Sequence, residues 1–316
     1  MKIFTSAQIR ELDKYTIEHE PIKSIDLMER AAKALTQAIT EVWDSSTPVI
    51  IFAGPGNNGG DAMAVGRMLM DKGYDVRTYL FNISGHLSEE CETHKNLLME
   101  KRPKSFIEVI QEFEPPQLDS NILIIDGLFG SGLNKPLAGG FASLVKYINA
   151  SKAKIVSIDV PSGLMTEDNT YNVRANIIRA NLTLTLQHKK LSFMFPENQQ
   201  FIGKLKVLDI RLSQEGIQKI DSNYTVIEEN DIRQRLLPRD PFAHKGKMGN
   251  ALIIAGSYGM GGASVLATKA CMRVGAGKVT THTPKRNSML LQISVPEAII
   301  EYRKSGSAGM PRPISY

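Results

Sequence analysis

Three short segments in the N-terminal part of the chain combine glycines with acidic or amide side chains, and each directly follows an apolar run. They are GPGNNGGD (54–61), DGLFGSGL (126–133) and DVPSG (159–163). Glycines let backbone amides approach a phosphate, above all at a helix N-terminus. A carboxylate at a strand end can transfer protons. Each segment alone could simply cap a turn, but three of them in one domain favour a binding or catalytic site.

The first segment matches the G-x-G-x-x-G pattern of dinucleotide-binding loops. The next apolar run, however, ends in Phe81-Asn82, where hydride-transfer enzymes carry a ribose-binding carboxylate. Asp61 also adds a negative charge at the helix start, which the helix dipole favours but a pyrophosphate does not. The segment therefore does not fit a standard hydride-transfer fingerprint.

The elements that must position these segments follow from the apolar patterning. Short continuous apolar runs are typical of strands buried on both faces. They are expected at 49–53, 76–81, 122–125, 155–158, 182–186 and 205–210, with helices at 62–72, 88–101 and 141–150 and two N-terminal helices, one beginning near Ser6 and one at 24–43. Strand–helix alternation predicts a parallel sheet with helices on both faces and ligands at the carboxyl ends of its strands.

A second domain is expected after residue 220, where polar and glycine residues interrupt the pattern. A strand at 251–255, a glycine-rich turn at 256–262, a helix ending near 275 and a strand at 279–283 follow. One such unit cannot close a core, so we expect 221–304 to be part of a domain. The Ser/Gly/Pro-rich residues 305–316 predict a disordered tail.

Composition excludes several classes of protein. The net charge of +5 is spread along the 316 residues without a basic block interleaved with aromatics, so nucleic acid is not an expected partner. Cys91 and Cys271 are far apart and form no CxxC pair, which argues against a disulfide framework and a zinc site. Charges in the first helix and the lack of any apolar run of about 18 residues predict a cytoplasmic protein without a membrane partner.

The three segments, in this order after two helices, resemble the YjeF N-terminal family of NAD(P)H-hydrate epimerases over roughly residues 1–212. The stretch from His244 to Thr280 resembles the start of the ADP-dependent NAD(P)H-hydrate dehydratases. The order matches bifunctional bacterial proteins that repair nicotinamide nucleotides. The resemblance implies an α/β protein with a Rossmann-like three-layer α/β/α epimerase domain (1–220) and a partial ribokinase-like α/β domain (221–304).

The resemblance also implies substrates and site residues. The epimerase would interconvert the R and S forms of NADHX and NADPHX, hydrated on the nicotinamide ring. A potassium ion would be held by Asn58, Asp126 and Ser162, whose oxygen atoms suit a hard cation. We further expect a homo-oligomer. The implied substrate-binding residues are Asn57, Asn58, Gly59, Gly60, Asp61, Gly130, Ser131, Gly132, Leu133, Asn134, Lys135, Pro136 and Asp159.

Asp159 is the candidate catalytic residue. Epimerisation at a carbon bonded to nitrogen and hydroxyl needs no redox step. A carboxyl group can help the hydroxyl leave, and a carboxylate stabilises the iminium intermediate before water returns. Lys189 and Lys190 either orient the ligand or form a solvated loop, and His188 is expected at the surface.

Two other functions stay open. In a dehydratase that uses ADP or ATP, Ala263 would line the substrate pocket, but no G-x-G-D motif follows Gly262, so we expect negligible dehydratase activity from this polypeptide. A non-catalytic dinucleotide-binding or dimerising scaffold is the alternative from another class. The presence of Asn58, Asp61, Asp126 and Asp159 favours the enzyme.

Overall fold

The computed structural model describes residues 1–236 and 238–303. The chain divides into two compact units, Met1–Glu228 and a second unit that begins at Glu229. The first unit extends beyond the boundary expected near residue 220, because β9 (Tyr224–Thr225) pairs antiparallel with β1 (Lys2–Ile3). The expected tail at 305–316 lies outside the described residues.

A seven-stranded sheet with the order β4-β3-β2-β5-β6-β7-β8 forms the centre of the first unit, and all its neighbouring strands are parallel. Strands β3 and β4 extend the sheet on one side of β2, and β5 to β8 extend it on the other side. The bounds are β2 (Val49–Ala53), β3 (Val76–Phe81), β4 (Phe106–Val109), β5 (Leu123–Gly127), β6 (Lys154–Ile158), β7 (Leu182–Leu186) and β8 (Lys204–Leu208). The predicted parallel sheet is thus confirmed, with β4 as an additional edge strand.

The helices of the first unit cover this sheet and its end. They are α1 (Ser6–His19), α2 (Ser24–Thr40), α3 (Asn57–Asp71), α4 (Glu89–Lys101), α5 (Gly139–Ala150), α6 (Gln199–Ile202) and α7 (Gln214–Lys219). Helix α3 begins at Asn57 rather than near residue 62, because Gly56 is its N-cap and accepts hydrogen bonds from the amides of Gly59 and Gly60. The NNGGD residues therefore form the first turn of a helix and not a loop.

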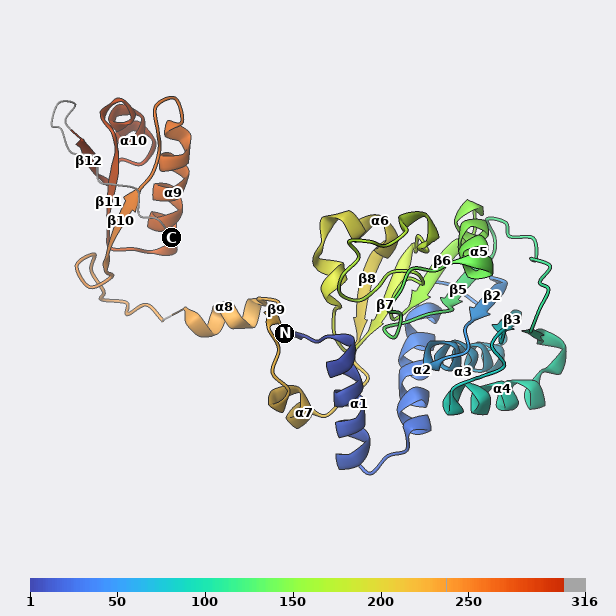
Figure 1. Ribbon diagram of the computed structural model, residues 1–316. Helices are drawn as coiled ribbons and strands as arrows, with labels where there is room; N and C mark the ends of the chain where they lie inside the picture. Colours follow the sequence, from blue (N-terminus) through green and yellow to red (C-terminus); the bar gives the residue numbers. More distant parts are fainter. Residues whose placement is uncertain (237, 304–316) are drawn as a thin grey trace. The chain divides into compact units, whose positions relative to one another are not determined.

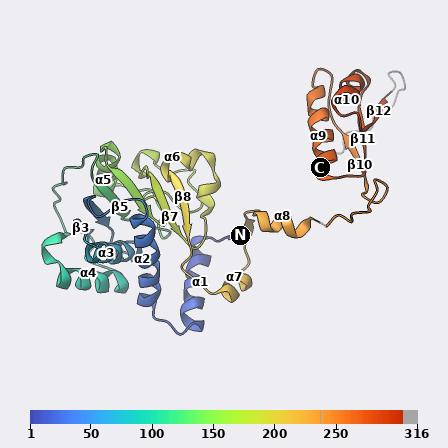
Figure 2. The same ribbon diagram turned by 180° about the vertical axis from the view of Figure 1, so that it is seen from behind.

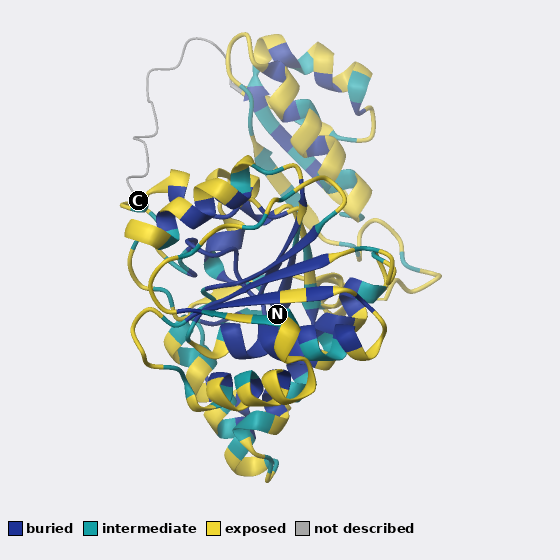
Figure 3. Ribbon diagram, turned by 90° about the vertical axis from the view of Figure 1, so that its right-hand side faces the viewer, coloured by how far each residue is buried: buried dark blue, intermediate teal, exposed yellow. Residues whose placement is uncertain are grey.

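Successive residues of the central strand β2 point into two different cores. Ile51 packs with Leu35 of α2 and Val65 of α3 on one face, whereas Phe52 packs with Val145 of α5 on the other. Helices α2, α3 and α4 accordingly lie on one side of the sheet and α5 on the other (Figures 1 and 2). The strands between them are mostly buried, as the dark ribbon of the sheet shows in Figure 3. This is the doubly wound arrangement that the apolar runs predict.

A smaller apolar cluster positions α1 at the end of the sheet. Leu12 of α1 and Leu27 of α2 pack against Ile210 and Leu212, which follow β8. A capping box formed by Thr5 and Gln8 fixes the start of α1. Polar side chains on the inner face of α1 consequently face the carboxyl ends of the strands.

The second unit contains a parallel sheet of order β10-β11-β12. Its elements are α8 (Glu229–Arg235), β10 (Asn250–Ile254), α9 (Gly261–Val274), β11 (Lys278–Pro284), α10 (Ser288–Ser294) and β12 (Ile299–Arg303). The strand–helix–strand unit is confirmed, while α10 and β12 were not predicted. None of the helices in the described ranges is long and apolar enough to cross a membrane.

Candidate functional site

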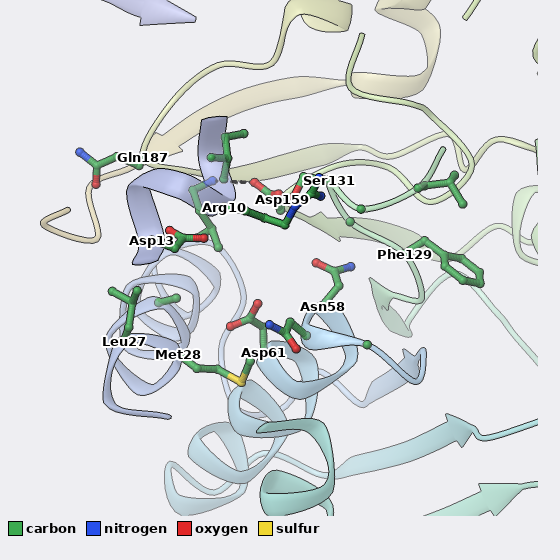
Figure 4. A pocket seen from close by; sticks show the side chains of 18 of the residues that line it. Arg10, Asp13, Leu27, Met28, Asn58, Asp61, Phe129, Ser131, Asp159 and Gln187 are labelled. Atoms are coloured by element: carbon green, nitrogen blue, oxygen red, sulfur yellow. Dashed lines mark hydrogen bonds between the residues drawn. The ribbon is translucent and has the colours of Figure 1, made fainter. Parts of the chain in front are cut away.

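A cavity of about 580 Å³ lies at the carboxyl ends of β2, β5, β6, β7 and β8 and is closed on one side by α1 and α2. Its volume is in the range of small-molecule sites. The sheet's direction of growth reverses between β2 and β5, and such a switch point is where doubly wound folds bind ligands. Figure 4 shows that polar side chains from several of these elements line the cavity.

The first turn of α3 contributes Asn57, Asn58 and Asp61 to the cavity. Gly59 and Gly60 do not line it. A Cβ atom on Gly59 would lie 1.8 Å from the carbonyl oxygen of Gly54, so this glycine lets the turn fold tightly onto the preceding loop. A Cβ atom on Gly60 would press on Met28 and Cys91, so this glycine lets α2 and α4 pack closely on α3. Both glycines thus contribute to the site through the packing of α3 and not through contact with the cavity.

The loop after β5 provides another wall, in which residues 130–135 line the cavity and Pro136 does not. A Cβ atom on Gly130 would lie 2.8 Å from Asn58 Oδ1, so this loop and the start of α3 are in close contact. Lys135 is the exposed basic residue of the loop. The predicted phosphate-binding segment therefore does border the same space as Asn58.

Beneath this loop, Asp126 and Ser162 form a buried hydrogen-bonded pair. Ser162 Oγ donates to Asp126 Oδ1 at 2.5 Å, and Asp126 Oδ2 accepts from the Ser162 amide at 2.9 Å and from Ser157 Oγ at 2.7 Å. Burial raises the pKa of Asp126, although these hydrogen bonds oppose the rise. The pair also holds the loop, because the Phe129 amide donates to Ser162 Oγ at 2.9 Å.

Asp159 is held in one orientation at the end of β6. Its Oδ1 atom accepts hydrogen bonds from the Leu186 amide at 3.1 Å and from Thr185 Oγ1 at 3.2 Å, and it lies 2.6 Å from Lys190 Nζ. Its Oδ2 atom has no hydrogen-bond donor in the part of the chain that the structure describes. The backbone φ of Asp159 is +61°, a conformation that is uncommon for a residue with a side chain and is enriched at functional sites.

Lys190 is almost completely buried, so the interpretation as a solvated loop is wrong for this lysine. Its ammonium group donates to the carbonyl oxygens of Leu186 and His188, both at 3.2 Å, besides pairing with Asp159. His188 is buried as well, contrary to the expectation of a surface position. It packs edge-on against Phe4 at 4.8 Å, and burial lowers its pKa to about 4.

Two charged residues of α1, Arg10 and Asp13, line the cavity, and the sequence analysis did not predict either of them. A signal was present in the sequence, because Asp13 lies four residues from both Ile9 and Ile17 and so falls on the apolar face of its helix. A charged residue on a buried face calls for an explanation. Burial, with the negative charge of Asp159, raises the pKa of Asp13 to about 6.

Asp61 of α3 is a buried carboxyl group that lines the cavity. Burial raises its pKa well above the usual range, and the charges of Asp159 and Asp13 add to the effect. No hydrogen bond or ion pair joins its side chain to any of the described residues. Ala263, the residue singled out in the second unit, is exposed on α9. It does not line this cavity.

The fold and the cavity define a doubly wound α/β protein with a cavity of small-molecule size at the strand ends. The family model described as YjeF-related protein N-terminus matches residues 24–192, more than half of the chain, and the model described as NAD(P)H-hydrate dehydratase matches residues 251–312. The chain belongs to the family of YjeF-related N-terminal domains, as its three motifs indicated.

Named relatives agree with this assignment. A protein of Limosilactobacillus fermentum named NAD(P)H-hydrate epimerase is 34% identical over 205 residues, which are 65% of this chain and 95% of that protein. A bifunctional NAD(P)H-hydrate repair enzyme Nnr of Coxiella burnetii is 31% identical over 281 residues, 89% of this chain and 56% of that protein. The chain thus spans little more than half the length of such bifunctional relatives. The crystal structure of yeast ynu0, YNL200c, shares the fold with a TM-score of 0.57 and 21% identity, covering 73% of this chain and 98% of that one.

Proposed function

We propose that the first unit is an NAD(P)H-hydrate epimerase that interconverts the R and S forms of NADHX and NADPHX. The observation that carries this proposal is the hydrogen bonding of Asp159. Three donors hold its Oδ1 atom, while its Oδ2 atom is available to a ligand in the cavity. The name of the Limosilactobacillus relative, which the chain covers almost completely, supports the same reaction.

In this reaction the carboxylate of Asp159 contacts the hydrated ring. When the hydroxyl leaves as water, the ring becomes an iminium cation, and the negative charge of Asp159 stabilises it. Asp159 also accepts a proton from the water that adds back. Asn57, Asn58 and Asp61 bind the dinucleotide from α3, and Gly130 to Lys135 bind its phosphates, with Lys135 supplying positive charge. Pro136, Gly59 and Gly60 shape these two walls.

We also propose a potassium ion held by Asn58, Asp126 and Ser162. The donor set fits such an ion, because all three side chains offer oxygen atoms. The buried carboxylate of Asp126 has no cationic partner among the described side chains. A bound potassium ion supplies a fixed positive charge beside the loop that faces the dinucleotide.

The test is whether the purified chain equilibrates the two NADHX epimers faster than they equilibrate spontaneously, followed by chromatography. We expect acceleration with wild-type protein and a loss of roughly 100-fold or more with Asp159→Asn. Near-normal turnover by this variant would remove Asp159 from the mechanism. A wild-type chain without any acceleration would favour the non-catalytic scaffold instead.

Three further properties belong to the proposal. We expect cytoplasmic localisation and a homo-oligomer with neither nucleic acid nor membrane as partner. We also expect that this polypeptide does not consume the S epimer when ADP or ATP is added, since no G-x-G-D motif follows Gly262. Loss of the S epimer that depends on nucleotide would contradict the last expectation.

A further inference from the structure

Asp13 places in the cavity a carboxyl group to which neither the proposed substrate contacts nor the packing of α1 assigns a role. Asp13 projects from α1 into the cavity, as Figure 4 shows, although it lies on its helix between the apolar residues Ile9 and Ile17. Its carboxyl group forms no hydrogen bond and no ion pair with the residues that the structure describes. Taking a carboxyl group out of water without a partner costs free energy, so such a group is usually retained for function.

Asp13 and Asp159 differ in their surroundings and lie on separate sides of the cavity. Asp159 follows β6 and is paired with Lys190, whereas Asp13 comes from α1 and faces open space. In Figure 4 the two carboxyl groups and that of Asp61 surround the same volume from different elements. No three acidic, histidine or cysteine side chains in the described ranges lie close enough to hold a metal ion together. The three carboxyl groups therefore surround the cavity without meeting at one point.

The proposed reaction needs proton transfer on both faces of the nicotinamide ring. The hydroxyl leaves from one face, and water must add to the other face to give the second epimer. A single carboxyl group on one face can assist only one of these steps directly. We infer that Asp13 is the second acid–base residue of the site, acting on the face of the ring opposite to Asp159. This inference rests on the proposed epimerase function.

The step balances without any other reactant. In one direction the Asp13 carboxyl proton passes to the hydroxyl oxygen, the C–O bond breaks with both electrons leaving on water, and the ring nitrogen lone pair forms the C=N bond. Water on the other face then forms a new C–O bond, the C=N electrons return to nitrogen, and Asp159 accepts the proton. Solvent afterwards returns a proton to Asp13 and takes one from Asp159. In the opposite direction the two residues exchange roles.

The charges around Asp13 suit this role. The other titratable groups that line the cavity are Arg10 on the same helix, Asp61 of α3, Lys135 after β5, Asp159 after β6, and His188 and Lys190 after β7. Burial and Asp159 raise the pKa of Asp13 to about 6, and Lys190 opposes them. A group with a pKa near the working pH is present in both protonation states, as a reversible epimerase requires.

The experiment compares the full-length chain with Asp13→Asn, Asp13→Glu and, as matched control, Glu11→Gln, which removes an exposed carboxylate from the same helix. We expect Asp13→Asn to lower kcat for NADHX epimerisation about 100-fold or more, with KM changed less than about threefold. Asp13→Glu should recover part of the loss, and Glu11→Gln should retain the wild-type rate. The melting temperature of each variant shows that it is folded.

The pH profile separates proton transfer from a merely structural role. Wild-type kcat/KM should bend near pH 6, and Asp13→Asn should lack this bend. If the wild-type chain is active and Asp13→Asn keeps its rate or its bend near pH 6, the inference is wrong and the proposed function stands. If the wild-type chain does not accelerate epimerisation at all, both are wrong.

Discussion

At the scale of single residues, the site combines one buried ion pair with two carboxyl groups that have no ion-pair partner among the described residues. Lys190 and Asp159 form a buried ion pair with an Nζ–Oδ1 distance of 2.6 Å, and residues 31 positions apart in the chain meet there. Asp13 and Asp61 lie beside this pair without partners among the described residues. The pair orients one carboxyl group, and its neighbours keep protons more easily than exposed carboxyl groups do.

Replacing Lys190 by Met should destabilise the first unit, because it leaves the carboxylate of Asp159 buried without its counter-charge. The expected loss is about 3–5 kcal/mol in the free energy of unfolding, measured by urea denaturation at pH 7. Lys189→Met, which changes a half-buried neighbour, should cost less than about 0.5 kcal/mol. The double variant Lys190→Met, Asp159→Asn should recover part of the loss. Equal stability of Lys190→Met and wild type would show that the pair contributes nothing to folding.

Asp13 should reduce stability at neutral pH, and its replacement should reveal the effect. The pKa of its carboxyl group is about 6 in the folded chain, against an ordinary value of 3.8 for an aspartate. The folded state therefore binds the proton more tightly, so the contribution of Asp13 to stability is fully present below about pH 3.8 and is lost as the pH rises through about 6. Asp13→Asn should be more stable than wild type by roughly 1–3 kcal/mol at pH 8 and equal to it at pH 3. An equal difference at both pH values would contradict this origin.

At the scale of elements, glycines bring the strand ends close enough to enclose one cavity. A Cβ atom on Gly54 would lie 1.8 Å from the carbonyl oxygen of Leu128, which is backbone and cannot rotate away. We expect Gly54→Ala to separate the loops after β2 and β5, to cost about 1–3 kcal/mol and to lower epimerase activity. Gly56→Ala is the matched control for stability, because its Cβ atom would meet nothing within 4 Å, and it should cost less than about 1 kcal/mol. Urea denaturation of both variants checks this, and equal losses would refute it.

The sequence predicts the buried strands and the order of the three motifs, since the strands at the centre of the sheet are rich in Val, Ile and Leu. It does not predict β4, because this edge strand is short and half-exposed and has no such run. Nor does it predict that the NNGGD residues begin α3, since glycines there suggest a loop. The ion pair between Lys190 and Asp159 is not predicted either, for a different reason. A lysine in a loop after a strand resembles solvated surface, and only the tertiary fold brings Asp159 to it.

At the scale of the whole molecule, the first unit should carry the proposed epimerase activity without the second unit. Every residue that lines the cavity lies between Ile9 and Leu212, and the first unit ends at Glu228. The described residues between 229 and 249 are almost all exposed, so a protease should cut there first. We expect a chain that ends after Glu228 to retain the epimerase kcat/KM of the full chain within about twofold and its urea midpoint. Limited trypsin digestion of the full chain, followed by mass spectrometry and the epimer assay, checks both points. A tenfold loss of activity in the shortened chain would mean that residues beyond Glu228 contribute to the site, and the assignment of catalysis to the first unit alone would be wrong.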